Sequence, residues 1–349
     1  MEQLMPLGAW AAVIGLIGGL VLGLAARLGD FCTLGALEAS VYGNDQTRVR
    51  LWGIVLGTAI LGTQLGGLLG VIDLSSTFYH QISWNPLASI AGGLIFGYGM
   101  AMAGNCGFGA LVRFGGGDLR SLIVVVTLGI SGFVALSGPL APLRATLFPQ
   151  HEATGAQGIL YDMMMVTGLP ALVIILVLGV SALTWALSHA PLRERPDMIV
   201  WGAAAGLAII WCFWGTSLIN NLSFGQIGVE GPAFTAPVGR TLIFMMTSTA
   251  GGITFSVGSV VGVMTGALIG SIIRGMFRWE ACEDPRELGR QVGGAAMMGV
   301  GGVIAMGCSI GQGVTAFATL AWSGPVTLAA IGVGAMVGLS HLIGGFQPE

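Results

Sequence analysis

Long stretches without any charged residue separate short clusters of charge in this chain of 349 residues. The longest such stretch runs from Gln291 to Pro348, 58 residues without Asp, Glu, Lys or Arg. Because about 20 apolar residues cross the hydrocarbon core of a bilayer, this stretch alone can hold two spans and a connection. Charged residues make up only 8% of the whole chain, against about 25% in soluble domains. A soluble globular fold is therefore excluded.

Nine segments are long and apolar enough to be predicted as membrane-spanning helices. Their approximate limits are residues 8–28, 48–72, 86–105, 119–138, 169–189, 196–215, 252–275, 287–306 and 323–344. Shorter apolar segments interrupted by glycine or proline, at 29–42, 104–117, 220–240 and 307–320, are predicted as broken or re-entrant helices. Irregular backbone at membrane depth is tolerated only where it is buried in protein or lines a polar cavity. The sequence thus predicts an all-α polytopic membrane protein whose broken segments surround a cavity.

All thirteen basic residues are arginines, and eleven of them fall in alternate loops between the predicted spans. The positive-inside rule then places the N-terminus outside and the C-terminus inside. This pattern is typical of a bacterial inner membrane. The absence of lysine excludes a Walker-type phosphate loop and Schiff-base chemistry. The net charge of −3 gives no indication of nucleic-acid binding.

The chain is predicted to contain an internal duplication at an offset of 202 residues. At this offset the first-half residues Gly92, Gly97, Gly99 and Cys106 fall on Gly294, Gly299, Gly301 and Cys308. We predict a first repeat in residues 1–150 (spans one to four), a linker with span five in 151–192, and a second repeat in 193–349 (spans six to nine). Because the odd fifth span separates the halves, the second enters the membrane inverted. Inverted repeats place substrate sites near the bilayer midplane.

Three of the five cysteines share a C-x-x-G motif at the start of a predicted broken segment: Cys32 with Gly35, Cys106 with Gly109, and Cys308 with Gly311. A single free cysteine is usually a small buried apolar residue, but one motif at three positions favours a function. The remaining two, Cys212 and Cys282, are interpreted as structural. Glycine lets the backbone approach a ligand closely, and the N-terminus of a half-helix attracts an anion without Lys or Arg.

Several kinds of chemistry use thiols in an uncharged, glycine-lined site. Three cysteines can ligate zinc or copper(I), but the motifs contain no histidine or carboxylate. A redox pair normally uses C-x-x-C, which is absent from the chain. The favoured interpretation is recognition of a soft sulfur-containing substrate, because a neutral S–H group is a weak donor suited to a sulfane sulfur. We expect no metal, no cofactor and no catalytic residue.

The motifs Asp30-Phe31-Cys32, Gly104-Asn105-Cys106-Gly107-Phe108-Gly109 and Gly307-Cys308-Ser309-Ile310-Gly311-Gln312-Gly313 resemble those of the YeeE/YedE family of sulfur-compound transporters. The similarity covers nearly the whole chain. It implies a bacterial inner-membrane protein of nine spans and inverted halves that takes up thiosulfate by passing it between cysteine-containing constrictions. The three functional cysteines of the family match Cys32, Cys106 and Cys308. The resemblance also implies a cytoplasmic sulfur-carrier protein of the TusA type as a separate partner chain.

The candidate substrate-binding residues are those of the three motifs together with one arginine beside a broken segment. They are Cys32, Gly35, Asn105, Cys106, Gly107, Gly109, Cys308, Ser309, Gly311, Gln312 and Arg240. The main alternatives are a transporter of sulfite, sulfane sulfur or a selenium species, and a membrane thiol oxidoreductase. Membrane lipid is the expected surroundings of the chain.

Overall fold

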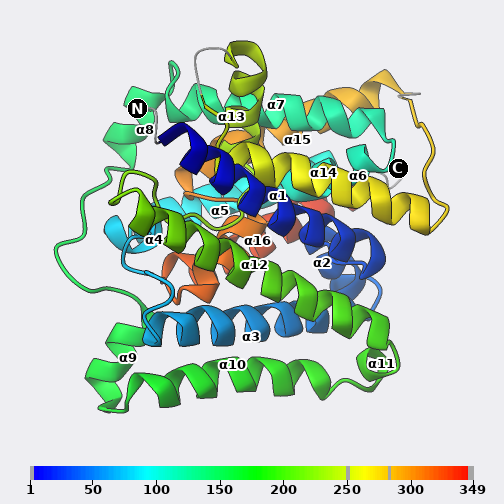
Figure 1. Ribbon diagram of the computed structural model, residues 1–349. Coiled ribbons are helices and arrows are strands. Elements are labelled where there is room, and N and C mark those ends of the chain that lie inside the picture. Colours follow the sequence, from blue (N-terminus) through cyan, green and yellow to red (C-terminus); the bar gives the residue numbers. More distant parts are fainter. Residues whose placement is uncertain (1–3, 249–251, 282–283, 345–349) are drawn as a thin grey trace.

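The computed structural model describes residues 4–248, 252–281 and 284–344 (Figure 1). Within these ranges the secondary structure is helical apart from three isolated β-bridges. Each of the nine longest helices overlaps one predicted span. They are α1 (Leu4–Leu28), α3 (Thr47–Leu68), α5 (Pro86–Ala103), α7 (Leu119–Leu136), α10 (Ala171–Leu187), α12 (Pro196–Leu222), α14 (Phe255–Ile273), α15 (Pro285–Ile304) and α16 (Ser323–Gly344).

Short helices occupy the predicted broken segments and the loops. They are α2 (Thr33–Val41), α4 (Phe78–Gln81), α6 (Gly107–Gly115), α8 (Ala141–Leu147), α9 (Ile159–Thr167), α11 (Ala190–Arg193), α13 (Ala236–Thr247) and the π-helix η1 (Gly311–Ala316). Three of the broken segments, 29–42, 104–117 and 307–320, each contain one of these short helices, α2, α6 and η1. The fourth, 220–240, contains the end of α12, a non-helical connection and the start of α13.

The all-α membrane fold is confirmed, but the count of nine spans is not. In the described part of the chain, seven helical segments are long and apolar enough to cross a membrane, and the pair α9 and α10, bent by 118°, makes up to eight. Alone, α10 has only 17 residues. The first turns of α15 carry three charged residues, Arg286, Glu287 and Arg290, which lower its hydropathy.

Glycine faces bring the long helices into close contact. Helix α1 packs along α14 and α12, and α5 packs between α15 and α16. A Cβ atom on Gly15, Gly19 or Gly23 of α1 would lie 2.3 to 2.4 Å from backbone oxygens of α14, so only glycine allows this approach. Close backbone contact at small residues is the usual way that membrane helices associate. In Figure 1, α4, α8 and α9 lie at one end of the bundle, and α2 and α11 lie at the other.

The elements of the two halves follow the same order. Helices α1, α2, α3, α5, α6 and α7 correspond at the offset of 202 residues to α12, α13, α14, α15, η1 and α16. Their packing partners exchange in the same way: α1 contacts α14 as α12 contacts α3, and α16 contacts α5 as α7 contacts α15. This correspondence supports the duplication, which stays a prediction together with its boundaries at residues 150 and 193.

Candidate functional site

The Cys106 loop places a thiol at the N-cap of α6. The Cys106 sulfur accepts a hydrogen bond of 3.3 Å from the backbone N–H of Gly109, and the side chain is fully buried. Serine, threonine or aspartate oxygen usually satisfies this backbone group. A Cβ on Gly107 would lie 2.9 Å from a terminal methyl group of Leu128, which would have to shift. The sequence thus fixes the sulfur through an ordinary capping geometry.

The Cys308 loop has the same geometry with one further donor. The Cys308 sulfur accepts hydrogen bonds of 3.3 Å from the backbone N–H groups of Gly311 and Phe234. A Cβ on Gly311 would lie 2.9 Å from the Cβ of Ala233. The hydroxyl of the buried Tyr79 donates a hydrogen bond of 2.8 Å to the Gly311 carbonyl at the start of η1. Two separate segments therefore hold this loop in place.

Cys32 occupies the N-cap of α2, but its side chain makes no capping hydrogen bond. Unlike Cys106 and Cys308, it is partly exposed. A Cβ on Gly35 would lie 3.7 Å from the Cys32 sulfur and 2.8 Å from a guanidinium nitrogen of Arg48. The missing side chain of Gly35 therefore leaves room between a thiol and a cationic donor.

The three cysteines belong to one connected group. The Cys32 thiol is within electrostatic range of Cys106, and Cys106 is within the same range of Cys308. Cys308 in turn is within range of Tyr79. The structure thus brings together three motifs that lie more than 70 residues apart along the chain, in the order Cys32, Cys106, Cys308.

Buried polar atoms without partners surround the cysteines. The hydroxyls of Thr33 and Ser309 interact with the Cys106 thiol, yet neither oxygen has a partner of full hydrogen-bond geometry. The side-chain oxygens of Asn105 and Gln312 are also buried without a partner. Leaving a buried polar group unpaired costs about 1–3 kcal/mol. The hydroxyls of Thr33 and Ser309 can donate to an anion, whereas the amide oxygens of Asn105 and Gln312 only accept hydrogen bonds and need a donor such as water.

Sequence reasoning missed two of the threonines near the broken segments. Thr33 follows Cys32 directly, and Thr235 lies 202 residues further along, at the N-cap of α13. Both hydroxyl oxygens are buried without a partner. The duplication offset itself was the signal that could have identified this pair. Gln312 was identified, and its amide nitrogen donates to the carbonyls of Ala305 and Met306 at 2.8 and 3.1 Å.

Aromatic rings keep the cysteine group dry. Phe31, Phe108 and Phe234 are buried, with ring centroids 6.4 Å apart for the first two and 5.1 Å apart for the last two. Trp52 packs on Phe31 at 5.0 Å. Water-excluding side chains strengthen every electrostatic contact made between them.

A cavity of 330 Å³, the arginine pocket, opens beside Cys32. It is lined by four candidate residues, Cys32, Gly35, Asn105 and Gly109, and by four arginines and two carboxylates: Arg27, Arg48, Arg113, Arg274, Asp30 and Glu38. An anion site without any positive side chain stays a prediction for the buried thiols, whereas the pocket beside Cys32 is lined by four arginines. The arginines were interpreted from the sequence only as markers of orientation, because their distance from the thiols depends on the fold.

A larger cavity of 1020 Å³, the strap pocket, is lined by residues of the connections before α5 and α9 and of the segment after η1. The segment 151–158, the strap, crosses it and is held by hydrogen bonds to the chain before α5. The Gln157 amide nitrogen donates to the carbonyls of His80 and Ile82 at 3.2 and 2.6 Å. The His80 ring nitrogens lie 3.0 Å from the carbonyl oxygens of Gln157 and Thr319. His80 thus joins the strap to the segment after η1.

Arg240 lies apart from the arginine pocket. It sits in α13, 3.6 Å from the carboxylate of Glu230, and donates a hydrogen bond of 3.3 Å to the hydroxyl of Ser256. Of the candidate residues, Cys106, Gly107, Cys308, Ser309, Gly311 and Gln312 are buried behind the pocket. Cys282 lies outside the described residues. Among the described residues, no cluster of three or more His, Cys, Asp or Glu could hold a metal ion.

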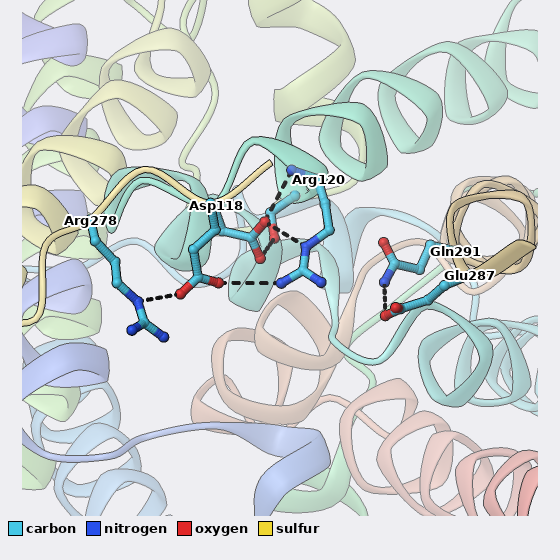
Figure 2. Close-up of polar contacts among 7 residues, drawn as sticks. Asp118, Arg120, Arg278, Glu287 and Gln291 are labelled. Atoms are coloured by element: carbon cyan, nitrogen blue, oxygen red, sulfur yellow. Dashed lines mark hydrogen bonds and ion pairs between the residues drawn. The ribbon is translucent and has the colours of Figure 1, made fainter. Parts of the chain in front are cut away.

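Ion pairs fasten the loop that follows α6 to the segment that precedes α15 (Figure 2). Arg120 contacts Asp118 at 3.2 Å and Glu280 at 3.3 Å, and Arg278 contacts Glu280 at 2.6 Å. Backbone hydrogen bonds reinforce this link, from Leu119 to Glu280 and from Glu280 to Gly117. The C-terminal end of α6, which carries Arg113 of the arginine pocket, is thereby held against the chain after α14.

Comparison with known proteins gives one family match and two relatives that are covered over about 90% of their length. A family model described as sulphur transport matches residues 28–337. The chain is 27% identical over 330 residues to the thiosulfate transporter TsuA of Escherichia coli strain K12, covering 90% of each chain. It is 26% identical over 327 residues to the thiosulfate transporter TsuA of Spirochaeta thermophila, covering 88% of this chain and 92% of the relative.

Proposed function

Because this chain belongs to the sulphur transport family, and is thus a transporter of sulfur compounds rather than an enzyme, we propose that it imports thiosulfate. The resemblance of its cysteine motifs to the YeeE/YedE family is confirmed by the family match. Two relatives that match along most of their length are named thiosulfate transporters. The proposed substrate follows from those names together with the chemistry of the cysteine group.

The observation that carries this proposal is the connected group of Cys32, Cys106 and Cys308. Thiosulfate has a soft terminal sulfur at one end and hydrogen-bond-accepting oxygens at the other. Neutral S–H groups are weak donors matched to the terminal sulfur, and unpaired hydroxyls such as that of Ser309 suit the oxygens. If a thiol contact contributes ~1 kcal/mol, each cysteine along the path prefers a soft sulfur about fivefold.

The thiols are neutral at rest in this mechanism. Three thiolates in a water-excluded interior would repel an anionic ligand and would each lose the hydration of their charge. The anion is handed from Cys308 to Cys106 and then to Cys32, because these neighbours are in electrostatic range of one another. Backbone N–H groups at the starts of α6 and η1 hold it between steps.

The arginines support an orientation for this proposal. Eleven of the thirteen lie in alternate loops, and the positive-inside rule then favours an arginine pocket on the cytoplasmic side of a bacterial inner membrane, with the N-terminus outside and the C-terminus inside. Thiosulfate then enters at the strap pocket and leaves beside Cys32. A cytoplasmic TusA-like sulfur carrier, which would be a separate chain, would receive it at that side. Arg240, at the opposite side from α2 in this orientation, attracts the anion before entry.

Uptake of radiolabelled thiosulfate by reconstituted protein in liposomes tests the proposal. We expect the variant C106A/C308A to lose at least nine-tenths of the uptake, while C212A keeps it. Cys212 is the matched control, because it is equally buried but lies outside the motifs. Equal uptake by C106A/C308A and the parent would exclude the cysteine relay. Competition by unlabelled sulfite, selenite or sulfate separates thiosulfate from other substrates. The preferred substrate should inhibit uptake at a lower concentration than the other anions.

A further inference from the structure

Two arginines of the arginine pocket, Arg48 and Arg113, form no direct ion pair. Arg274 contacts Asp30 at 3.2 Å and the Leu28 carbonyl, and Arg27 donates a hydrogen bond of 3.2 Å to the Val112 carbonyl. In the described part of the chain, the guanidinium groups of Arg48 and Arg113 make neither an ion pair nor a hydrogen bond, and both are within electrostatic range of Glu38. The four arginines and two carboxylates that line the pocket leave it an excess of two positive charges.

These two arginines face the cysteine end of the pocket. Arg48 and Arg113 both interact electrostatically with the Cys32 thiol. The Arg48 guanidinium and the Cys32 sulfur also border the same small volume, the one that a side chain at Gly35 would fill. Asn105, which is only 3% exposed, also lines the pocket. Its unpartnered side-chain oxygen is buried and can only accept a hydrogen bond, so it does not contribute to anion binding. Cationic donors and a thiol therefore converge on one space.

We propose that Arg48 and Arg113, with Cys32 and the open face of Gly35, form a second anion site that takes a doubly charged sulfur oxyanion as it leaves the thiols. The pocket's excess of two positive charges matches a charge of −2, and the planar donors of Arg48 and Arg113 suit adjacent oxyanion oxygens. The site deepens the proposed function and rests on it for the identity of the transported anion. Its chemistry also admits sulfate, which lacks the soft sulfur that the buried thiols select.

The arginine pocket has a role distinct from that of the buried cysteines. Inside the cysteine group, only thiols and backbone dipoles compensate the anion for its lost hydration. The arginine pocket stabilises the anion with fixed positive charge in a solvent-facing space. An anion that reaches Cys32 is drawn outward by this charge, because positively lined clefts concentrate anions. The pocket therefore acts on release, and sulfate on the same side competes for it.

The charge of the pocket can be measured without any transport assay. Detergent-solubilised protein is treated with two methanethiosulfonate reagents of similar size, one bearing a sulfonate and one a trimethylammonium group, and labelling of the Cys32 peptide is followed by mass spectrometry. We expect the sulfonate reagent to react faster, and the ratio of the two rates to fall about tenfold in R48Q/R113Q. R50Q is the matched control: Arg50 lies on the same helix but stacks on Trp185 at 4.3 Å and does not line the pocket.

Binding is tested by protection with sulfate, which does not react with these reagents. At constant ionic strength, sulfate should slow the labelling of Cys32 relative to chloride in the parent and in C106A/C308A, but not in R48Q/R113Q. If R48Q/R113Q does not fold, R48K/R113K keeps the charge and should keep the rate ratio. An unchanged ratio in folded R48Q/R113Q, or no protection by sulfate in the parent, overturns the site. Failure of the proposed function shows separately, as absent thiosulfate uptake by the parent.

Discussion

The loops of Cys106 and Cys308 place their sulfurs in the same way, whereas the loop of Cys32 does not. In the first two, the sulfur accepts a backbone N–H at 3.3 Å three residues on and is fully buried. In the third, the capping hydrogen bond is missing and the thiol borders a solvent-facing pocket. One C-x-x-G motif thus serves two purposes. Two copies hold a thiol within buried protein, and one leaves it partly exposed beside arginines.

Alanine substitution of single cysteines tests this comparison most strongly. C106A and C308A should each reduce thiosulfate uptake at least about tenfold, because each removes a thiol and leaves backbone N–H groups unpaired, one in C106A and two in C308A, at about 1–3 kcal/mol each. C32A, which leaves no such group, should reduce uptake about fivefold, from a contact of ~1 kcal/mol. Initial rates in liposomes give the measurement, with C212A as the control. Equal losses of uptake in all three variants would show that the capping hydrogen bonds make no difference to transport.

Alkylation rates measure the same difference without transport. N-ethylmaleimide should label Cys32 about tenfold faster than Cys106 or Cys308, since reaction requires access to the thiolate. Peptide mass spectrometry after timed quenching resolves the sites, and labelling of the buried Cys212 calibrates the rate of a cysteine that is reached only by local opening. Labelling of Cys106 as fast as Cys32 would contradict the closed conformation of its loop.

Alanine at the motif glycines should sharpen the comparison further. G311A should reduce uptake most, because the new Cβ would lie 2.9 Å from the Cβ of Ala233, which cannot move without its backbone. G35A should have a smaller effect, severalfold at most, because its Cβ would meet the flexible end of Arg48. In G109A the nearest atom is 3.4 Å away, so uptake should change least. The reverse order, measured at equal amounts of folded protein, would contradict the packing described for these loops.

The smallest effect is expected at the ion pairs beside the arginine pocket. E280Q removes the contacts of Glu280 to Arg120 and Arg278, which are partly exposed and so worth about 1 kcal/mol or less. A slight fall in the thermal unfolding temperature at low salt, which disappears at high salt, is the expected result. R144Q, on the far side of the chain and free of such contacts, is the control. A lower unfolding temperature that persists at high salt would indicate that E280Q disturbs packing and not only charge.

The helices were predictable from the sequence, because a bilayer imposes a length and an apolarity that composition alone reveals. All nine predicted spans overlap a helix, and three of the broken segments contain short helices capped at or next to the motif cysteines. Long apolar segments without charge form helices in lipid, because their backbone hydrogen bonds must be made within the segment. The number of spans was not settled in this way, since α10 is short and α15 begins with charged residues.

The surroundings of the cysteines were predictable only in part. The residues adjacent in sequence, such as Asn105 and Ser309, were identified from the motifs. Tyr79, Phe234 and Arg274 were not, because each reaches the site from a distant segment and its own neighbours in sequence carry no motif. Contacts over 70 or more residues depend on how the helices pack. Arg27 and Arg113 lie close to the motifs in sequence, but, like Arg48, they were interpreted only as loop charges.

The π-helical turn at Gly311–Ala316 gives the second half one property that α6 in the first half lacks. A wider turn contains an additional residue, and turns of this kind occur frequently at functional sites. Deleting one residue within it would tighten the turn to α-helical geometry and leave the chain from Phe317 onward on the same face, so that the Thr319 carbonyl could still meet the His80 ring. The same deletion in the regular turns of α6 would rotate the following residues by about 100°. The second half therefore tolerates a change in length at this position that the first half does not.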